Sequence, residues 1–161
     1  MIFAVISIVL TVVAVVLSYY STVYSSVVAF LGLCCAGLMP QVALPANTYI
    51  FWGVAMLIVV ALGYVLPPSV TRSRLGMAYI AGASLAGMLA GLSLSHAAMI
   101  TGAFAGALLG GVAFAKTPKG KALEFPTSKF FNYLCAKGLP VVITMSIAGT
   151  TAAILYTMWP D

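Results

Sequence analysis

Long apolar runs, separated by short links that carry polar residues or proline, make up almost the whole chain. A membrane-spanning helix needs about 20 predominantly apolar residues to cross roughly 30 Å of hydrocarbon. The runs predict an all-α, polytopic transmembrane helical bundle of about six spans in a single domain. The predicted spans are 2–17, 25–39, 49–66, 76–94, 97–115 and 140–159.

Two adjacent predicted spans, 76–94 and 97–115, carry small residues at helical spacing. Glycine costs about 1 kcal/mol relative to alanine in a water-exposed helix, so a series of glycines indicates close approach of two backbones. The short link at 93–97 then predicts an antiparallel hairpin, which we expect at the centre of the bundle. The predicted helix-packing residues are Gly82, Gly87, Gly91, Gly102, Gly106 and Gly110.

Positively charged residues are confined to two stretches of the chain. Arg72 and Arg74 follow the third predicted span, and five of the seven positive residues lie between Lys116 and Lys137. Cytoplasmic loops carry an excess of Lys and Arg, so both stretches are predicted to be cytoplasmic. With six spans, both termini then lie outside the cytoplasm. The link at 18–26 carries no positive charge, so five spans with a cytoplasmic N-terminus is the alternative.

A short amphipathic helix is predicted at 128–137, before the last span. Pro126-Thr127 is typical of a helix start, and Gly138 with Pro140 is typical of a stop. Its predicted apolar side holds Phe130, Phe131, Leu134 and Cys135, opposite Lys129, Asn132 and Lys137. Such a helix lies at the cytoplasmic interface, where positive residues contact anionic lipid headgroups. The predicted lipid-contact residues are Arg72, Arg74, Lys116, Lys119, Lys121, Lys129 and Lys137.

The composition argues against most catalytic and ion-coupled chemistry. The 161 residues are 63% hydrophobic and 6% charged, and the only acids, Glu124 and Asp161, lie outside the predicted spans. Paired-carboxylate catalysis needs two acids together, and coupled transporters usually place ionisable residues within their spans. The net charge of +5 is explained by positive-inside topology rather than by nucleic-acid binding. We therefore expect no enzyme, no cofactor and no nucleic-acid partner.

The three cysteines and the single histidine predict no metal or redox site. Cys34 and Cys35 lie in an apolar run and Cys135 lies among positive residues, so we interpret all three as reduced, small apolar residues. His96 falls in the predicted external link, where a lone histidine is typical of a structural residue because metal sites need several ligands. A pH-sensing role is the alternative, and a His96→Gln variant with unchanged behaviour between about pH 5 and 8 would contradict it.

The small-residue pattern from Gly82 to Gly111 resembles that of glycine-zipper membrane proteins, which include small bacterial inner-membrane families. The resemblance implies a bacterial inner membrane and assembly as a homo-oligomer or with a membrane protein partner. We expect a non-enzymatic structural or accessory subunit. The alternative is a passive channel or uncoupled small permease, with a pathway lined by Ser146, Thr150, Thr157 and the glycine faces.

Overall fold

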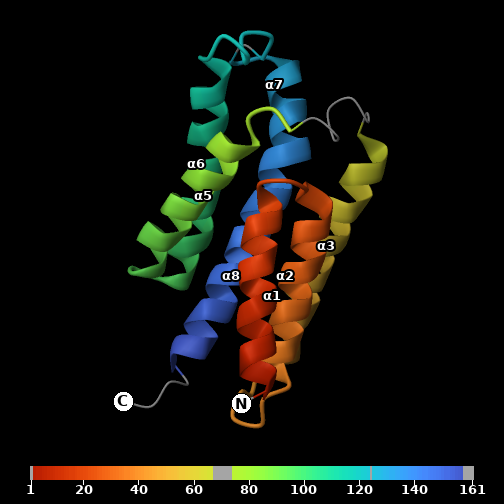
Figure 1. Cartoon of the computed structure of the whole chain (residues 1–161), viewed down its shortest axis with the longest axis vertical. Coiled ribbons are helices and arrows are strands. Elements are labelled where there is room, and N and C mark those ends of the chain that lie inside the picture. The colour runs from red at the N-terminus through yellow and green to blue at the C-terminus, as the bar shows by residue number, and fades with distance from the viewer. Residues whose placement is uncertain (1, 67–73, 124, 158–161) are drawn as a thin grey trace.

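The computed structural model of the chain describes residues 2–66, 74–123 and 125–157. Within these ranges the chain is helical and holds no strand, which confirms the all-α fold class (Figure 1). The helices are α1 (Ile2–Ser18), α2 (Thr22–Gly37), α3 (Ala46–Val65), α5 (Met77–Leu92), α6 (His96–Ala115), α7 (Ser128–Tyr133) and α8 (Leu139–Thr157), with a π-helix, η1 (Leu134–Gly138), between the last two. Each predicted span overlaps one of these helices.

Within the described ranges, three helices are long and apolar enough to cross a membrane. They are α3, α6 and the continuous helix formed by α7, η1 and α8. The apolar helices α1, α2 and α5 are shorter, with 17, 16 and 16 residues. A helical bundle with spans of this kind is consistent with a membrane protein.

The helix α8 lies at the centre of the bundle (Figure 1). It packs against α1, α2, α3, α5 and α6, and its residues from Thr144 to Thr151 are all buried. The α5–α6 hairpin lies on one flank, so the prediction of a central hairpin is wrong. The reason is that α5 and α6 turn their small residues toward each other, and larger side chains such as Leu89 and Leu109 are left exposed on the outside.

The predicted interfacial helix is continuous with the last predicted span. Its start is as predicted, since Thr127 Oγ1 accepts a hydrogen bond from the backbone N–H of Phe130 at 3.3 Å. The predicted stop at Gly138 and Pro140 is wrong, because α7, η1 and α8 form one helix of 30 residues. At 1.5 Å per residue this helix is about 45 Å long, which exceeds the roughly 30 Å of bilayer hydrocarbon.

The π-helix η1 explains how the helix continues past Pro140. Proline donates no backbone hydrogen bond, and its ring crowds the carbonyl four residues earlier. In η1 the N–H of Leu139 bonds to the carbonyl of Leu134, five residues back, and this wider turn accommodates the proline. The extra residue also rotates the helix faces on the two sides of the turn relative to each other. The predicted sides are therefore wrong: Lys137 is 3% exposed, whereas Phe131 is 50% exposed.

The turn before α5 is fixed against α7. Gly76 has a φ of 77°, in the left-handed region that favours glycine, and a methyl group there would overlap Tyr133 and Phe114. The Tyr133 hydroxyl donates a hydrogen bond to the carbonyl of Leu75. These contacts hold the start of α5 close to the end of α6 and to α7.

Candidate functional site

The backbones of α5 and α6 are in direct contact along the hairpin. A methyl group built on any of five glycines would overlap a backbone carbonyl of the facing helix; these are Gly87, Gly91, Gly102, Gly106 and Gly110. Gly87 and Gly102 face each other, each against the other's carbonyl. Between the contact of Gly87 with Gly102 and the contact at Gly106, Ser84 Oγ donates a hydrogen bond to the carbonyl of Ala103 at 2.9 Å. Because the two backbones are this close, van der Waals packing and Cα–H···O contacts between them hold the two helices together.

Gly82, the sixth predicted packing residue, lies outside this contact. The nearest atom to a methyl group built there is the Tyr19 hydroxyl, at 3.9 Å. At about 100° per residue, Gly82 is about 140° around the helix from Gly87, so the two cannot face the same neighbour. This angle follows from the sequence alone, so the sequence could have shown that Gly82 and Gly87 lie on different faces of the helix.

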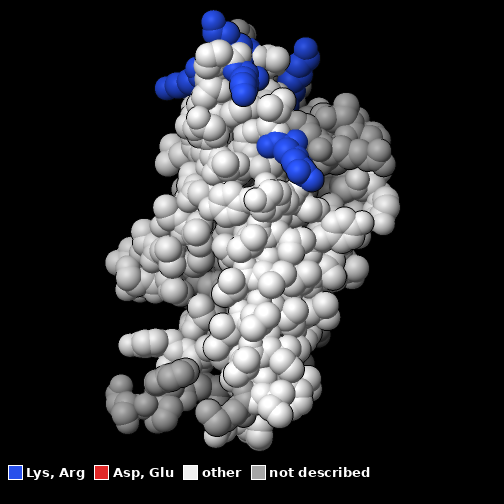
Figure 2. Space-filling model, in the orientation of Figure 1, with Lys and Arg blue, Asp and Glu red and all other residues white. Residues whose placement is uncertain are grey.

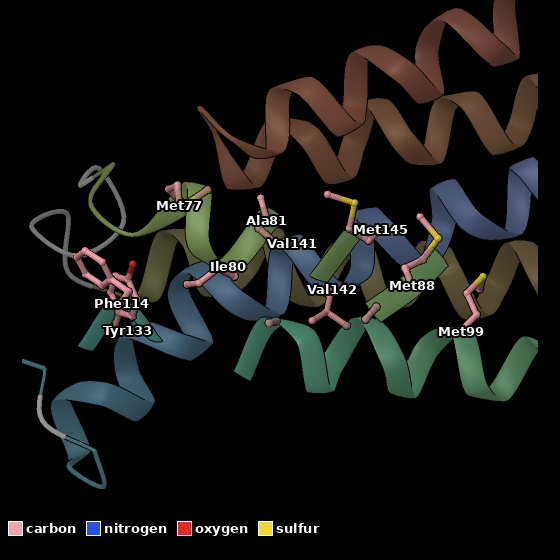
Figure 3. Close-up of a cluster of buried hydrophobic side chains, with 12 residues drawn as sticks. Met77, Ile80, Ala81, Met88, Met99, Phe114, Tyr133, Val141, Val142 and Met145 are labelled. Atoms are coloured by element: carbon pink, nitrogen blue, oxygen red, sulfur yellow. The ribbon is translucent and has the colours of Figure 1, made fainter. Parts of the chain in front are cut away.

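The space between the hairpin and α8 is filled by large, flexible side chains (Figure 3). The buried cluster includes Met77, Ile80, Ala81, Met88, Met99, Phe114, Tyr133, Val141, Val142 and Met145. A methyl group built on Gly149 of α8 would meet the sulfur atoms of Met88 and Met99. Methionine side chains thus occupy the space next to the predicted polar face of α8.

The three hydroxyl residues predicted to line a pathway lie in different environments. Ser146 and Thr150 are buried, whereas Thr157 is exposed near the end of α8. Thr150 Oγ1 donates to the carbonyl of Ser146 at 2.8 Å, and Thr157 Oγ1 donates to the carbonyl of Ile154 at 2.8 Å. Ser146 Oγ is buried and has no hydrogen-bond partner among the described residues. The structure therefore brings Ser146 and Thr150 together and leaves Thr157 apart.

An open groove of about 520 Å³ lies between the last turns of α5 and α8. Its walls include Leu89 and Leu92 on one side and Ala153, Tyr156 and Thr157 on the other. The lining is mostly apolar, which suits contact with the apolar chains of a bilayer.

His96 is the first residue of α6 and contacts α8. Its Nε2 atom lies 3.2 Å from Thr150 Oγ1. Because the hydroxyl proton of Thr150 is directed to the carbonyl of Ser146, this contact requires a proton on Nε2 of the imidazole. The pair connects the tip of the hairpin to the central helix, which gives His96 a structural contact.

Sequence reasoning missed a polar contact between α2 and α8. Ser25 Oγ and Thr144 Oγ1 are both fully buried and lie 3.1 Å apart. Thr144 Oγ1 also donates a hydrogen bond to the carbonyl of Pro140 at 2.9 Å. Ser25 lies where the predicted link at 18–26 meets the second predicted span, and its partner is 119 residues away. No local pattern could have paired them.

The predicted lipid-contact residues separate into distinct groups. Four lysines are exposed at the end of the molecule where α6 leads into α7; they are Lys116, Lys119, Lys121 and Lys129 (Figure 2). Arg74 is also exposed, but its guanidinium lies 5.9 Å from the ring centre of Tyr20, beside the α1–α2 turn. Lys137 is buried in η1, so the prediction that it contacts headgroups is wrong. Arg72 lies outside the described residues.

The cysteines are all free in the described part of the chain. Cys34 and Cys35 are half-buried and Cys135 is exposed. In the same part of the chain, no three His, Cys, Asp or Glu side chains are close enough to share a metal ion.

The chain matches no protein-family model, no characterised protein and no solved structure. The arguments about function that follow therefore rest on the geometry described above.

Proposed function

We propose that this chain is a non-enzymatic structural or accessory subunit of a membrane assembly, built as a six-span bundle with an internal glycine zipper. One observation carries the proposal: apart from Ser146, the buried residues most suited to chemistry or transport make contacts within the chain. The hairpin glycines meet the facing backbone, Ser84 and Thr150 bond to carbonyls, and Ser25 bonds to Thr144. The hydroxyls of Ser84 and Ser25 connect helices, and in lipid such bonds matter because apolar contact alone provides little driving force between helices.

The distribution of charge supports a six-span topology with a cytoplasmic basic end. The start of α1 and the end of α8 lie at the same end of the molecule, opposite the connection between α6 and α7 (Figure 1). The lysines gather at that connection (Figure 2). Positive-inside topology then favours a cytoplasmic position for the α6–α7 connection, in what we propose is a bacterial inner membrane.

An exposed apolar face suited to a partner lies on α3. Of its 20 residues, Trp52 and Val59 are buried, while Phe51, Val54 and Leu57 belong to its exposed apolar side. Because the small faces of α5 and α6 are used within the hairpin, we propose that a second copy or another membrane protein packs against α3.

Native mass spectrometry of the gently extracted protein tests this proposal. We expect one defined complex, either with itself or with one partner. A variant with Phe51→Ala and Leu57→Ala should weaken the complex, whereas Leu109→Ala, an exposed position on α6, should leave it intact. A wild type that remains monomeric under every mild extraction condition would overturn the proposal.

A second candidate function is a passive channel or uncoupled permease. The observation in its favour is the buried hydroxyl of Ser146, which has no hydrogen-bond partner among the described residues. A pathway there requires the hairpin to move away from α8, because Met88 and Met99 lie against Gly149. Solute flux through liposomes that contain only this chain, reduced by Ser146→Ala, would favour the channel over the accessory subunit.

A further inference from the structure

The end of the molecule where α6 leads into α7 combines exposed positive charge with exposed aromatic rings. We define this surface as the basic cap; its residues are Lys116, Lys119, Lys121, Phe125, Lys129 and Phe131. The four lysines are exposed, and Figure 2 shows positive residues gathered at this end. Among the described residues the cap holds no acidic side chain, and Glu124 lies outside them.

The two phenylalanines of the cap are held in place although they are half exposed. Phe125 and Phe131 are 52% and 50% exposed, and their ring centres lie 6.4 Å apart. Both rings pack edge-on against the fully buried Phe130, at 5.1 Å and 5.9 Å between ring centres. Phe130 in turn packs on Gly111 of α6. The fold therefore supports two rings that it does not cover.

The length of the last helix places the cap at headgroup depth. The 19 residues of α8 extend about 28 Å, which matches the roughly 30 Å of bilayer hydrocarbon. The 11 residues of α7 and η1 together extend about 16 Å further, into and past the headgroup layer. The cap therefore lies outside the hydrocarbon, at the membrane surface, where its ammonium groups can pair with lipid phosphates.

We propose that the basic cap binds the headgroups of anionic phospholipids, with Phe125 and Phe131 in contact with the bound lipid beside the lysines. Ammonium groups pair with phosphate as point charges, so four of them favour a lipid with net negative charge over a zwitterionic one. Charge complementarity and position together select lipid as the occupant, because the cap lies just outside the hydrocarbon when α8 spans it. This inference goes beyond the proposed accessory role.

Lipid binding by the full chain in neutral detergent micelles tests the proposal. Native mass spectrometry measures the affinity for phosphatidylglycerol and for phosphatidylcholine. The wild type should prefer phosphatidylglycerol by about tenfold or more, and the combined Lys116→Gln, Lys119→Gln, Lys121→Gln and Lys129→Gln variant should lose that preference. The Phe125→Ala and Phe131→Ala double variant should bind both lipids more weakly and keep the preference.

The control is Leu109→Ala, which alters an exposed, uncharged position on α6 outside the cap. It should keep the preference of the wild type, and an unchanged size-exclusion profile shows that each variant is folded. If the combined variant does not fold, Lys129→Gln alone should reduce the preference about threefold.

Three results would overturn the proposal. The first is equal affinity of the wild type for the two lipids, and the second is a preference that survives removal of the four lysines. The third is displacement of phosphatidylglycerol by a polyglutamate peptide that binds the chain as tightly as the lipid does. That result would make the cap a surface for an acidic protein.

Discussion

Replacing Gly106 with alanine measures how strictly α5 and α6 depend on backbone contact. The added methyl group would overlap the carbonyl oxygen of Ala83 and lie 2.9 Å from Cα of Ser84, inside the 3.4–4 Å of ordinary van der Waals contact. Both groups belong to the backbone, so no side-chain rotation can make room. The helices must separate by on the order of 1 Å, a gap that removes a large part of the attraction between facing atoms.

The cost follows from three contributions. Overpacking of a close-packed interior typically costs about 1–3 kcal/mol. Separation of the helices also stretches the 2.9 Å hydrogen bond from Ser84 Oγ to the Ala103 carbonyl, which is worth about 1 kcal/mol. The higher helix propensity of alanine offsets up to about 1 kcal/mol of this loss of stability. We expect Gly106→Ala to lower the free energy of unfolding by about 2 kcal/mol.

The matched control is Gly82→Ala, because that position has room for a methyl group, with the Tyr19 hydroxyl 3.9 Å away. This variant should be as stable as the wild type or more stable by up to about 1 kcal/mol. Unfolding by sodium dodecyl sulfate in mixed micelles, followed by circular dichroism, gives the midpoint for each protein. Equal midpoints for Gly106→Ala and Gly82→Ala would refute the reasoning.

Three further predictions concern polar residues, and the same unfolding assay measures each. Lys137→Ala should lower the free energy of unfolding by about 1–3 kcal/mol because the side chain is buried. Its control, Lys129→Ala, should change that free energy by less than about 0.5 kcal/mol. Equal effects of the two substitutions would contradict the burial of Lys137. Ser25→Ala should cost about 1 kcal/mol, and a double-mutant cycle with Thr144→Val should show coupling; additive losses would rule out the contact between the two hydroxyls. His96→Gln should preserve stability equally from about pH 5 to 8, since glutamine can also donate to a hydroxyl; a pH-dependent difference from wild type would favour a sensing role.

The sequence pattern predicted the structure correctly where that structure is determined by neighbouring residues. An apolar run of membrane length has few alternatives to a helix, and each predicted span overlaps a helix in the structure. The link between α5 and α6 is so short that the glycines of one helix can reach those of the other, as Gly87 and Gly102 do. The start of α7 at Thr127 follows from the capping chemistry of threonine and was also predicted.

Where the structure depends on contacts between distant parts of the chain or on an irregular helical turn, the sequence pattern did not predict it. The stop predicted at Pro140 rests on the geometry of a regular α-helix, and the π turn at η1 changes that geometry. The same turn determines that Lys137 is buried, which no amphipathic period of 3.6 residues can anticipate. In the candidate site, Thr150 is joined to His96 and not to Thr157, because pairing across helices depends on how α6 meets α8.

The central position of α8 follows from what drives helices together in lipid. Apolar side chains gain little there by leaving the hydrocarbon, so small residues and interhelical hydrogen bonds decide which helix has the most neighbours. The stretch from Thr144 to Thr151 offers hydroxyls and small residues on several sides of the helix, and it meets α2 at Ser25, α6 at His96, and both hairpin helices at Gly149. In α5 and α6 the five glycines in backbone contact all face the other helix of the hairpin, so each helix has one very close neighbour, and the hairpin lies on the flank. The closest contacts of α8 are thus distributed over several helices, whereas those of the hairpin glycines are made with one helix, and this difference accounts for the central position of α8.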